Sequence, residues 1–400
     1  MYKVLMILGL LLLPGPARAQ IESQAGRWEI PTIVSRAAVV MDAETGTVIY
    51  SKNPDMEIPP ASLTKLMTMH LGFKEIYEGR ASLDEMIEPT SESWAVNQLP
   101  LSSLMHLGPA QKLSLRELFL GLSIFSGNDA SAAVALRFAP TVEDFVEMMN
   151  VESRALGLSR TRFADASGYS EHNMTTAREF AEFTRIYLRE HPQSLAEFHS
   201  ISEFTYPKFE NWLGPFDENS IIRTQRNRNT LVGRVEGVDG LKTGSIPAAG
   251  FNIALTAERL GTRFIAIILG APAGWGGDRI RDLDGERLLD WAFDNYHTIR
   301  LRLDAPGPVR VWKGSRSSIS TAWGAPLEFT ALLERGAGLS WHIETERTII
   351  APLPAGSRVG NLLIYDSLGE LRRIPLITTA EVQRGNFFKR FIDSIRLFFR

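Results

Sequence analysis

The chain contains no cysteine. This absence excludes disulfide frameworks, thiolate zinc sites, cysteine nucleophiles and a lipidated N-terminal cysteine. A strong charge of one sign is also missing, because 43 Lys and Arg stand against 46 Asp and Glu, for a formal net charge of −3. Nucleic-acid binders are usually strongly basic, so the composition argues against such a partner. The 400 residues are enough for two globular domains.

Residues 1–19 have the pattern of a secretory signal peptide. Lys3 precedes an apolar run over 4–13, and Ala17 and Ala19 provide the small residues of a cleavage site. The run is too short for a stable membrane anchor, and two prolines follow it. We therefore expect cleavage after Ala19 and an exported mature chain. The alternative is a retained N-terminal anchor.

Apolar patterning predicts an α/β (α+β) domain over 26–296 and a small all-β sandwich domain over 297–377. Strand-like runs open and close the first domain and are expected to meet in one antiparallel sheet: 37–41, 47–50, 251–257 and 263–269. Helical spacing fills the middle and the end of that domain: 62–73, 115–125, 130–138, 142–156, 177–189 and 282–296. After this point only short alternating runs occur, separated by Pro and Gly.

The first motif with chemical meaning is Ser62-Leu63-Thr64-Lys65. On a helix, residues i and i+3 share a face, so the amine of Lys65 can approach the hydroxyl of Ser62. Lys65 can act as a base if burial and a neighbouring positive charge lower its pKa. A chain of this length contains about one such four-residue pattern by chance, so the motif alone is weak.

The second motif, Ser126-Gly127-Asn128, follows an apolar helical pattern. A hydroxyl and an amide two residues apart can face one cleft, the hydroxyl relaying a proton and the amide binding a substrate amide. The plainer interpretation is an N-cap for the next helix.

The third motif, Lys242-Thr243-Gly244, is expected to enter the strands that follow. Glycine allows a ligand backbone to approach closely, while Thr243 and Lys242 supply groups that hold a carboxylate. The alternative is a solvated turn with an exposed lysine.

Taken together, the order and spacing of the three motifs resemble those of penicillin-binding proteins and β-lactamases. Longer matches resemble the D-alanyl-D-alanine carboxypeptidases of low molecular mass in particular: residues 58–62, 126–130, 227–229, 238–244 and 351–360. The resemblance covers nearly the whole mature chain. It implies a β-lactamase/transpeptidase-like fold with a helical subdomain, a peptidoglycan stem peptide ending in D-Ala-D-Ala as substrate, and covalent inhibition by β-lactams.

The resemblance also implies catalytic roles. Ser62 is expected to attack the carbonyl between the two D-alanines while Lys65 takes its proton, and water then hydrolyses the acyl-enzyme. The backbone N–H groups of Ser62 and Ser245 are expected to bind the oxyanion. Ser126 and Lys242 are expected to relay a proton to the leaving amine.

Substrate binding is implied for Asn128, Thr243, Gly244 and Arg228. Asn128 is expected to bind the substrate amide, and Thr243 and Arg228 the terminal carboxylate, since arginine suits planar bidentate pairing. Arg228 has an alternative as one member of a solvated basic cluster. The family often has Thr two residues after the Lys-Thr-Gly motif, whereas this chain has Ile246.

No cofactor is implied, because the seven histidines lack metal-ligand spacing and no nucleotide-binding signature occurs. A β-lactamase or D,D-endopeptidase with the same acylation chemistry is the alternative among enzymes. Glu171 and Glu179 are candidates for the loop glutamate that deacylation by a β-lactamase requires, although neither has the expected surrounding pattern. A non-catalytic cell-wall-binding protein is the alternative from another class.

The C-terminal segment 381–400 predicts an amphipathic helix. At about 100° per residue, its aromatic and aliphatic residues other than Leu397 fall within roughly 140°. Charged residues occupy the other side, with Arg390 at one edge of the apolar arc. Such a helix suits the headgroup region of an anionic leaflet, so we expect residues 384–400 to attach the protein to the periplasmic side of the cytoplasmic membrane. The alternative is a terminal helix docked on the protein or on a partner.

Overall fold

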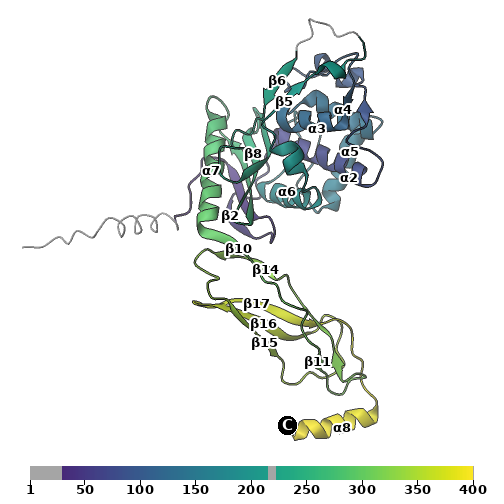
Figure 1. Cartoon of the computed structure of the whole chain (residues 1–400), viewed down its shortest axis with the longest axis vertical. Helices are drawn as coiled ribbons and strands as arrows, with labels where there is room; N and C mark the ends of the chain where they lie inside the picture. Colours follow the sequence, from purple (N-terminus) through teal and green to yellow (C-terminus); the bar gives the residue numbers. More distant parts are fainter. Residues whose placement is uncertain (1–28, 215–221, 400) are drawn as a thin grey trace, which may run out of the picture.

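The computed structural model describes residues 29–214 and 222–399, so the predicted signal peptide lies outside the described residues. A five-stranded antiparallel sheet in the order β2-β1-β9-β8-β7 forms the centre of the larger part (Figure 1). The strands are β1 Ala37–Asp42, β2 Val48–Lys52, β7 Val238–Ile246, β8 Gly250–Arg259 and β9 Thr262–Ala271. The expected meeting of the first and last strands in one sheet is confirmed, since β1 pairs with β9.

Both faces of this sheet are covered, and every residue of β1 is buried. Helix α7 (Gly277–Asn295) packs against β8 and β9 on one side, and α6 (Ala177–Glu190) packs against β1 and β9 on the other. Alternate residues of β1 therefore enter different cores. Val39 belongs to the core shared with the helical region, and Val40 to the core beneath α7.

The helical region begins with a short 3-10 turn η1 (Ala61–Thr64) that leads directly into α2 (Lys65–Tyr77). The other helices and turns of this region are α3 Leu115–Leu120, η4 Gly121–Phe125, α4 Asn128–Phe138, α5 Val142–Ala155 and η5 Leu195–His199. The predicted helix over 115–125 changes to a π turn in η4, its last five residues. Short strands and turns complete the helical region: β3 Met86–Ile87, η2 Ser91–Ser93, η3 Ala95–Asn97, β4 Leu113–Ser114, β5 Glu203–Tyr206, η6 Phe209–Asn211 and β6 Arg223–Arg226.

A smaller all-β part follows α7 and was expected from the short alternating runs. Its main sheet has the order β13-β17-β16-β15, and β10 pairs with β14 beside it. The strands are β10 Tyr296–Arg300, β11 Val309–Arg310, β12 Ser318–Ile319, β13 Thr321–Trp323, β14 Glu328–Leu332, β15 Ser340–Thr345, β16 Arg358–Asp366 and β17 Gly369–Thr378. The chain ends in α8 (Phe387–Phe398), at the end of the molecule remote from the helical region (Figure 1).

Candidate active site

The three sequence motifs converge on one cleft of about 630 Å³. Ser62 comes from η1, Asn128 from the start of α4 and Ser245 from β7, and all three line the cleft. Residues of the segments 99–103 and 168–172, together with Ile246, Pro247 and Ala248, form the rest of the wall. Groups separated by more than 180 residues are thus brought together where the central sheet meets the helical region.

Lys65 is fully buried and makes three hydrogen bonds. Its Nζ donates to Ser62 Oγ at 3.1 Å, to Asn128 Oδ1 at 2.8 Å and to the Ser167 carbonyl oxygen at 2.6 Å. Because η1 leads into α2 without a break, the i and i+3 side chains lie on one face, as the spacing predicts. The amine is therefore held within hydrogen-bonding distance of the Ser62 hydroxyl.

The pKa of Lys65 is lowered from 10.5 to about 7, mainly because burial penalises the charged amine. Asp165 opposes this shift and Arg228 adds to it. The pKa of Lys242 also lies well below its usual value, through burial first and then the charges of Lys65 and Arg228. The charge of Arg228 thus lowers the pKa of both lysines, and the two buried amines disfavour each other's charged form.

Strand β7 lies directly against the turn that carries Ser62. A Cβ placed on Gly244 would lie 2.8 Å from the Ser62 backbone nitrogen and 2.9 Å from the Pro60 oxygen, so only glycine permits this approach. Asn252 on β8 donates to the Pro59 oxygen at 2.8 Å and fixes the same turn. The Lys-Thr-Gly motif was expected to enter the following strands, and it lies inside β7 instead, with Lys242 and Thr243 buried.

The Ser-x-Asn motif is not a helix cap. Ser126 is buried and in the left-handed conformation, with φ 61°, which ends the π turn η4. Gly127 occupies the N-cap position of α4, and no side chain there accepts a capping bond. The amide of Asn128 instead accepts from Lys65 and donates to Ser102 Oγ at 3.0 Å. The plainer N-cap interpretation is therefore wrong.

Arg228 is exposed like the arginines near it in sequence, but its guanidinium is anchored on one side. Its Nε donates to the Phe125 carbonyl oxygen at 3.0 Å, and burial lowers the pKa of its guanidinium. Arg223 and Arg226 are exposed on β6. The turn that presents Arg228 is fixed by Asn227, whose Nδ2 donates to the His199 and Ile201 carbonyl oxygens. Arg228 is therefore anchored at the end of η4 through its Nε, while the residue remains exposed to solvent.

One loop important to the site has no signal in the sequence. Asp165 accepts backbone N–H bonds from Ser167, Gly168 and Ser170, and these bonds outweigh burial and keep the pKa of its carboxyl below the usual value. The loop thereby aims the Ser167 carbonyl at Lys65. A Cβ on Gly168, whose φ is +81°, would lie 1.8 Å from the Ala61 oxygen. No motif spacing links this loop to Ser62, since the contact is purely tertiary.

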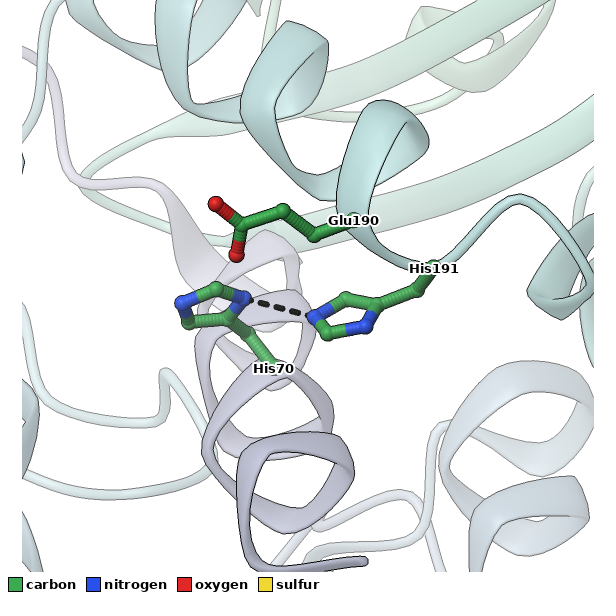
Figure 2. A group of neighbouring side chains, drawn as sticks. All are labelled: His70, Glu190 and His191. Atoms are coloured by element: carbon green, nitrogen blue, oxygen red, sulfur yellow. Dashed lines mark hydrogen bonds between the residues drawn. The ribbon is translucent and has the colours of Figure 1, made fainter. Parts of the chain in front are cut away.

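His70, Glu190 and His191 form a second group of titratable side chains (Figure 2). Within the described ranges, this is the group whose ligand atoms lie close enough to hold a metal ion. His70 Nδ1 lies 2.8 Å from His191 Nε2, which is the separation of a hydrogen bond. On its other side, His70 Nε2 lies 3.0 Å from Glu152, which accepts from Lys74 at 2.6 Å. The result is a hydrogen-bonded chain between α2, α5 and the end of α6.

The fold and the cleft together define a serine acyl-transferase of the β-lactamase/transpeptidase-like class, with a lysine beside the nucleophile. The family model for D-alanyl-D-alanine carboxypeptidase matches residues 23–273. The chain belongs to the D-alanyl-D-alanine carboxypeptidase family, and the predicted family and serine-type carboxypeptidase activity are confirmed.

Individual relatives agree with this assignment. The D-alanyl-D-alanine carboxypeptidase DacC of Escherichia coli is 32% identical over 378 residues, covering 93% of this chain and 90% of that one. Penicillin binding protein 5 of Haemophilus influenzae is 27% identical with a TM-score of 0.75, over 89% of this chain and 99% of that chain. A penicillin-binding protein of Listeria monocytogenes in its ampicillin-bound form is 29% identical with a TM-score of 0.56, over 66% of this chain and 100% of that chain.

Proposed function

We propose that this chain removes the terminal D-alanine of peptidoglycan stem peptides through an acyl-enzyme on Ser62. Neutral Lys65 takes the hydroxyl proton, Ser62 Oγ bonds to the carbonyl carbon between the two D-alanines, and D-alanine leaves. Water then hydrolyses the ester and restores Ser62. The observation that carries the proposal is the buried amine 3.1 Å from Ser62 Oγ, with a pKa of about 7.

The leaving amine needs a proton, and we assign its delivery to Ser126 and Lys242. Both side chains are buried beside the cleft, and the electrostatic influence of Lys65 on the pKa of Lys242 indicates that the two amines are close. The oxyanion is assigned to the backbone N–H groups of Ser62 and Ser245. The close approach at Gly244 supports this assignment, because it brings the two backbones to van der Waals contact.

Substrate recognition is assigned to Asn128, Thr243 and Arg228. Asn128 has an amide already oriented by Lys65 and Ser102, and it lines the cleft. Thr243 and Arg228 are assigned to the terminal carboxylate. Arg228 has only its Nε engaged by the Phe125 carbonyl among the bonds described, and its terminal nitrogens suit bidentate pairing with a carboxylate.

The test is release of D-alanine from a pentapeptide ending in D-Ala-D-Ala. Ser62→Ala is expected to release none above background, and it is expected to lose covalent labelling by a fluorescent β-lactam. Ser315→Ala, an exposed serine in the smaller part, is the matched control and is expected to retain both. Undiminished release by Ser62→Ala would contradict the assignment of the nucleophile.

A β-lactamase is the second candidate, and Glu171 is the observation that favours it. Glu171 lines the cleft, whereas Glu179 accepts bonds from Arg160 and Thr161 in the neighbouring turn. A β-lactamase would hydrolyse the β-lactam acyl-enzyme repeatedly, and Glu171→Gln would slow that step. A long-lived adduct, formed and lost at the same rate in Glu171→Gln and in wild type, is the outcome expected of the carboxypeptidase.

We also propose that residues 1–19 direct export and that α8 attaches the mature chain to the periplasmic side of the cytoplasmic membrane. In α8 the polar side, not the apolar side, is docked on the protein. The Lys313 N–H donates to buried Asp393 at 2.7 Å, and Lys389 lies 3.3 Å from the same carboxylate. The apolar face is exposed, with Phe388 76% and Phe398 84% accessible. Exposed aromatic residues at this density need a covering surface.

None of the described helices is long and apolar enough to cross a bilayer. Attachment in the plane of the headgroups is the arrangement that the exposed face supports. A chain that ends at Asn386 keeps buried Val382 and is expected to move from the membrane to the soluble fraction with its turnover intact. Phe388→Ser is expected to weaken sedimentation with membranes, and Ser394→Ala, on the same helix, is the control. Unchanged sedimentation of the shortened chain would contradict the attachment.

A further inference from the structure

A cavity of about 730 Å³ lies between the smaller all-β part and α8. Three of its lining residues are arginines, Arg310, Arg347 and Arg396, against one acid, Glu346. The arginines come from three separate segments of the chain, so the positive charge is assembled by the fold. This cavity has no role in the proposed catalysis, because every group assigned to catalysis above lies in the larger part.

The cavity has a rigid side. The guanidinium of Arg310 lies 3.8 Å from the ring centre of Trp312, which is buried. Stacking on a fixed indole restricts the arginine and orients its plane. A planar guanidinium that is already oriented suits paired hydrogen bonds to phosphate oxygens. Arg310 lies on β11, outside α8, so an amphipathic helix acting alone would not require it.

Arg396 connects the cavity to the apolar face of α8. At about 100° per residue, Arg396 falls roughly 40° beyond Ile392, the last residue of that face, and well before docked Asp393. It therefore lies at the border between the exposed apolar face and the side attached to the protein. When the apolar face lies among acyl chains, a residue at this border lies at the level of the phosphates.

We propose that this cavity binds the phosphate group of an anionic phospholipid while α8 lies on the membrane. The proposal rests on the membrane attachment proposed above. The lining has two more positive than negative charges, and the planar guanidinium groups of its arginines favour a phosphate-bearing anion. Because Arg396 lies at the border of the apolar face, a lipid headgroup is favoured over a soluble phosphate ester. Arg310 and Arg396 contact the phosphate, and the exposed phenylalanines contact the acyl chains.

The binding test uses the mature full-length chain and dihexanoylphosphatidylglycerol below its micellar concentration, followed by titration calorimetry. One saturable site is expected. Arg310→Gln is expected to weaken binding at least tenfold, and Arg316→Gln, an exposed arginine near α8 that does not line the cavity, to change it less than twofold. Absence of saturable binding, or equal weakening by both variants, would overturn the site. Glycerol 3-phosphate is expected to bind at least tenfold more weakly, and equal affinity would overturn the lipid as the source.

A vesicle experiment separates this proposal from the attachment itself. Wild type is expected to bind phosphatidylcholine vesicles through α8 and to bind more tightly when phosphatidylglycerol is added. Arg310→Gln is expected to bind phosphatidylcholine vesicles as tightly as wild type but to lose most of the gain in affinity that phosphatidylglycerol gives. The chain ending at Asn386 is expected to bind neither kind of vesicle. If wild type binds neither vesicle, the attachment is wrong. If Arg310→Gln keeps the full preference for phosphatidylglycerol, the cavity proposal is wrong.

Discussion

The pH dependence of acylation is the sharpest test of the active-site assignment. At pH 7, an amine with a pKa of about 7 is half neutral, whereas an ordinary lysine with a pKa of 10.5 is neutral in about 3 of 10,000 molecules. Burial of Lys65 thus raises the fraction of usable base more than a thousandfold. The lowering of the pKa from 10.5 to about 7 corresponds to about 5 kcal/mol. The protein bears this cost in its folded state, where the charged form of Lys65 is disfavoured.

The assay is the second-order rate constant for acylation by a fluorescent β-lactam between pH 5 and 9. It is expected to rise about tenfold from pH 5 to 6, to reach half its plateau at pH 7 and to change little above pH 8. Arg228→Gln is expected to move the midpoint upward, because the charge of Arg228 lowers the pKa of Lys65. Arg228→Lys keeps the charge and is the control. A rate that is flat from pH 5 to 9, or still rising tenfold per unit at pH 9, would refute the reasoning.

Three further predictions concern stability and packing. Burial lowers the pKa of His191 and of His199 to about 3, from about 6.5 in the unfolded chain. The contribution of these two groups to the free energy of unfolding is therefore complete above pH 6.5, where both are neutral, and is lost as the pH falls. The free energy of unfolding is expected to fall by about 1.4 kcal/mol per pH unit and per histidine as pH drops from 6.5 towards 3, and denaturant titration of His191→Asn should show a shallower slope. Gly244→Ala is expected to lower the rate constant of acylation at least tenfold, because its Cβ would press on the Ser62 turn, whereas Gly214→Ala, with open space around its Cβ, should keep the wild-type rate. Asp129→Asn is expected to lower the free energy of unfolding by about 2 kcal/mol, since the buried carboxylate accepts the N–H groups of residues 105–107, and an unchanged denaturation midpoint would contradict this.

Much of the fold could be predicted from local patterns. Apolar runs identified β1 and β9, and helical spacing identified α5 and α6 to within one or two residues. The π turn η4 could not be found, because its apolar residues fit an α-helical period equally well until Ser126 ends it. Strand β7 was harder still to predict, because the charged and small residues of its Lys-Thr-Gly motif are not typical of a buried strand.

The approach of Lys65 to Ser62 could be predicted because the relation between the two residues is local, i to i+3 on one helical face. Ser167, Asp165 and Ser102 could not, because their contacts join segments that no spacing rule connects. For the same reason, the hydrogen-bonded series of His70, Glu152 and His191 could not be predicted, because its members lie on α2, on α5 and at the end of α6. Sequence patterns therefore indicated candidate reacting groups, whereas the side chains that orient them come together only in the folded chain.

The bond from the Lys313 backbone to Asp393 has a mechanical consequence. A tail joined only by a flexible linker would let the enzyme tumble above a surface, but a helix clamped through its acidic residue fixes one angle between that surface and the long axis of the molecule. Helix α8 and the helical region lie at opposite ends of that axis (Figure 1). In the proposed attachment, Ser62 would then be held at a constant height above the lipid, and the height of a peptide as well as its chemistry would decide whether it reaches the cleft.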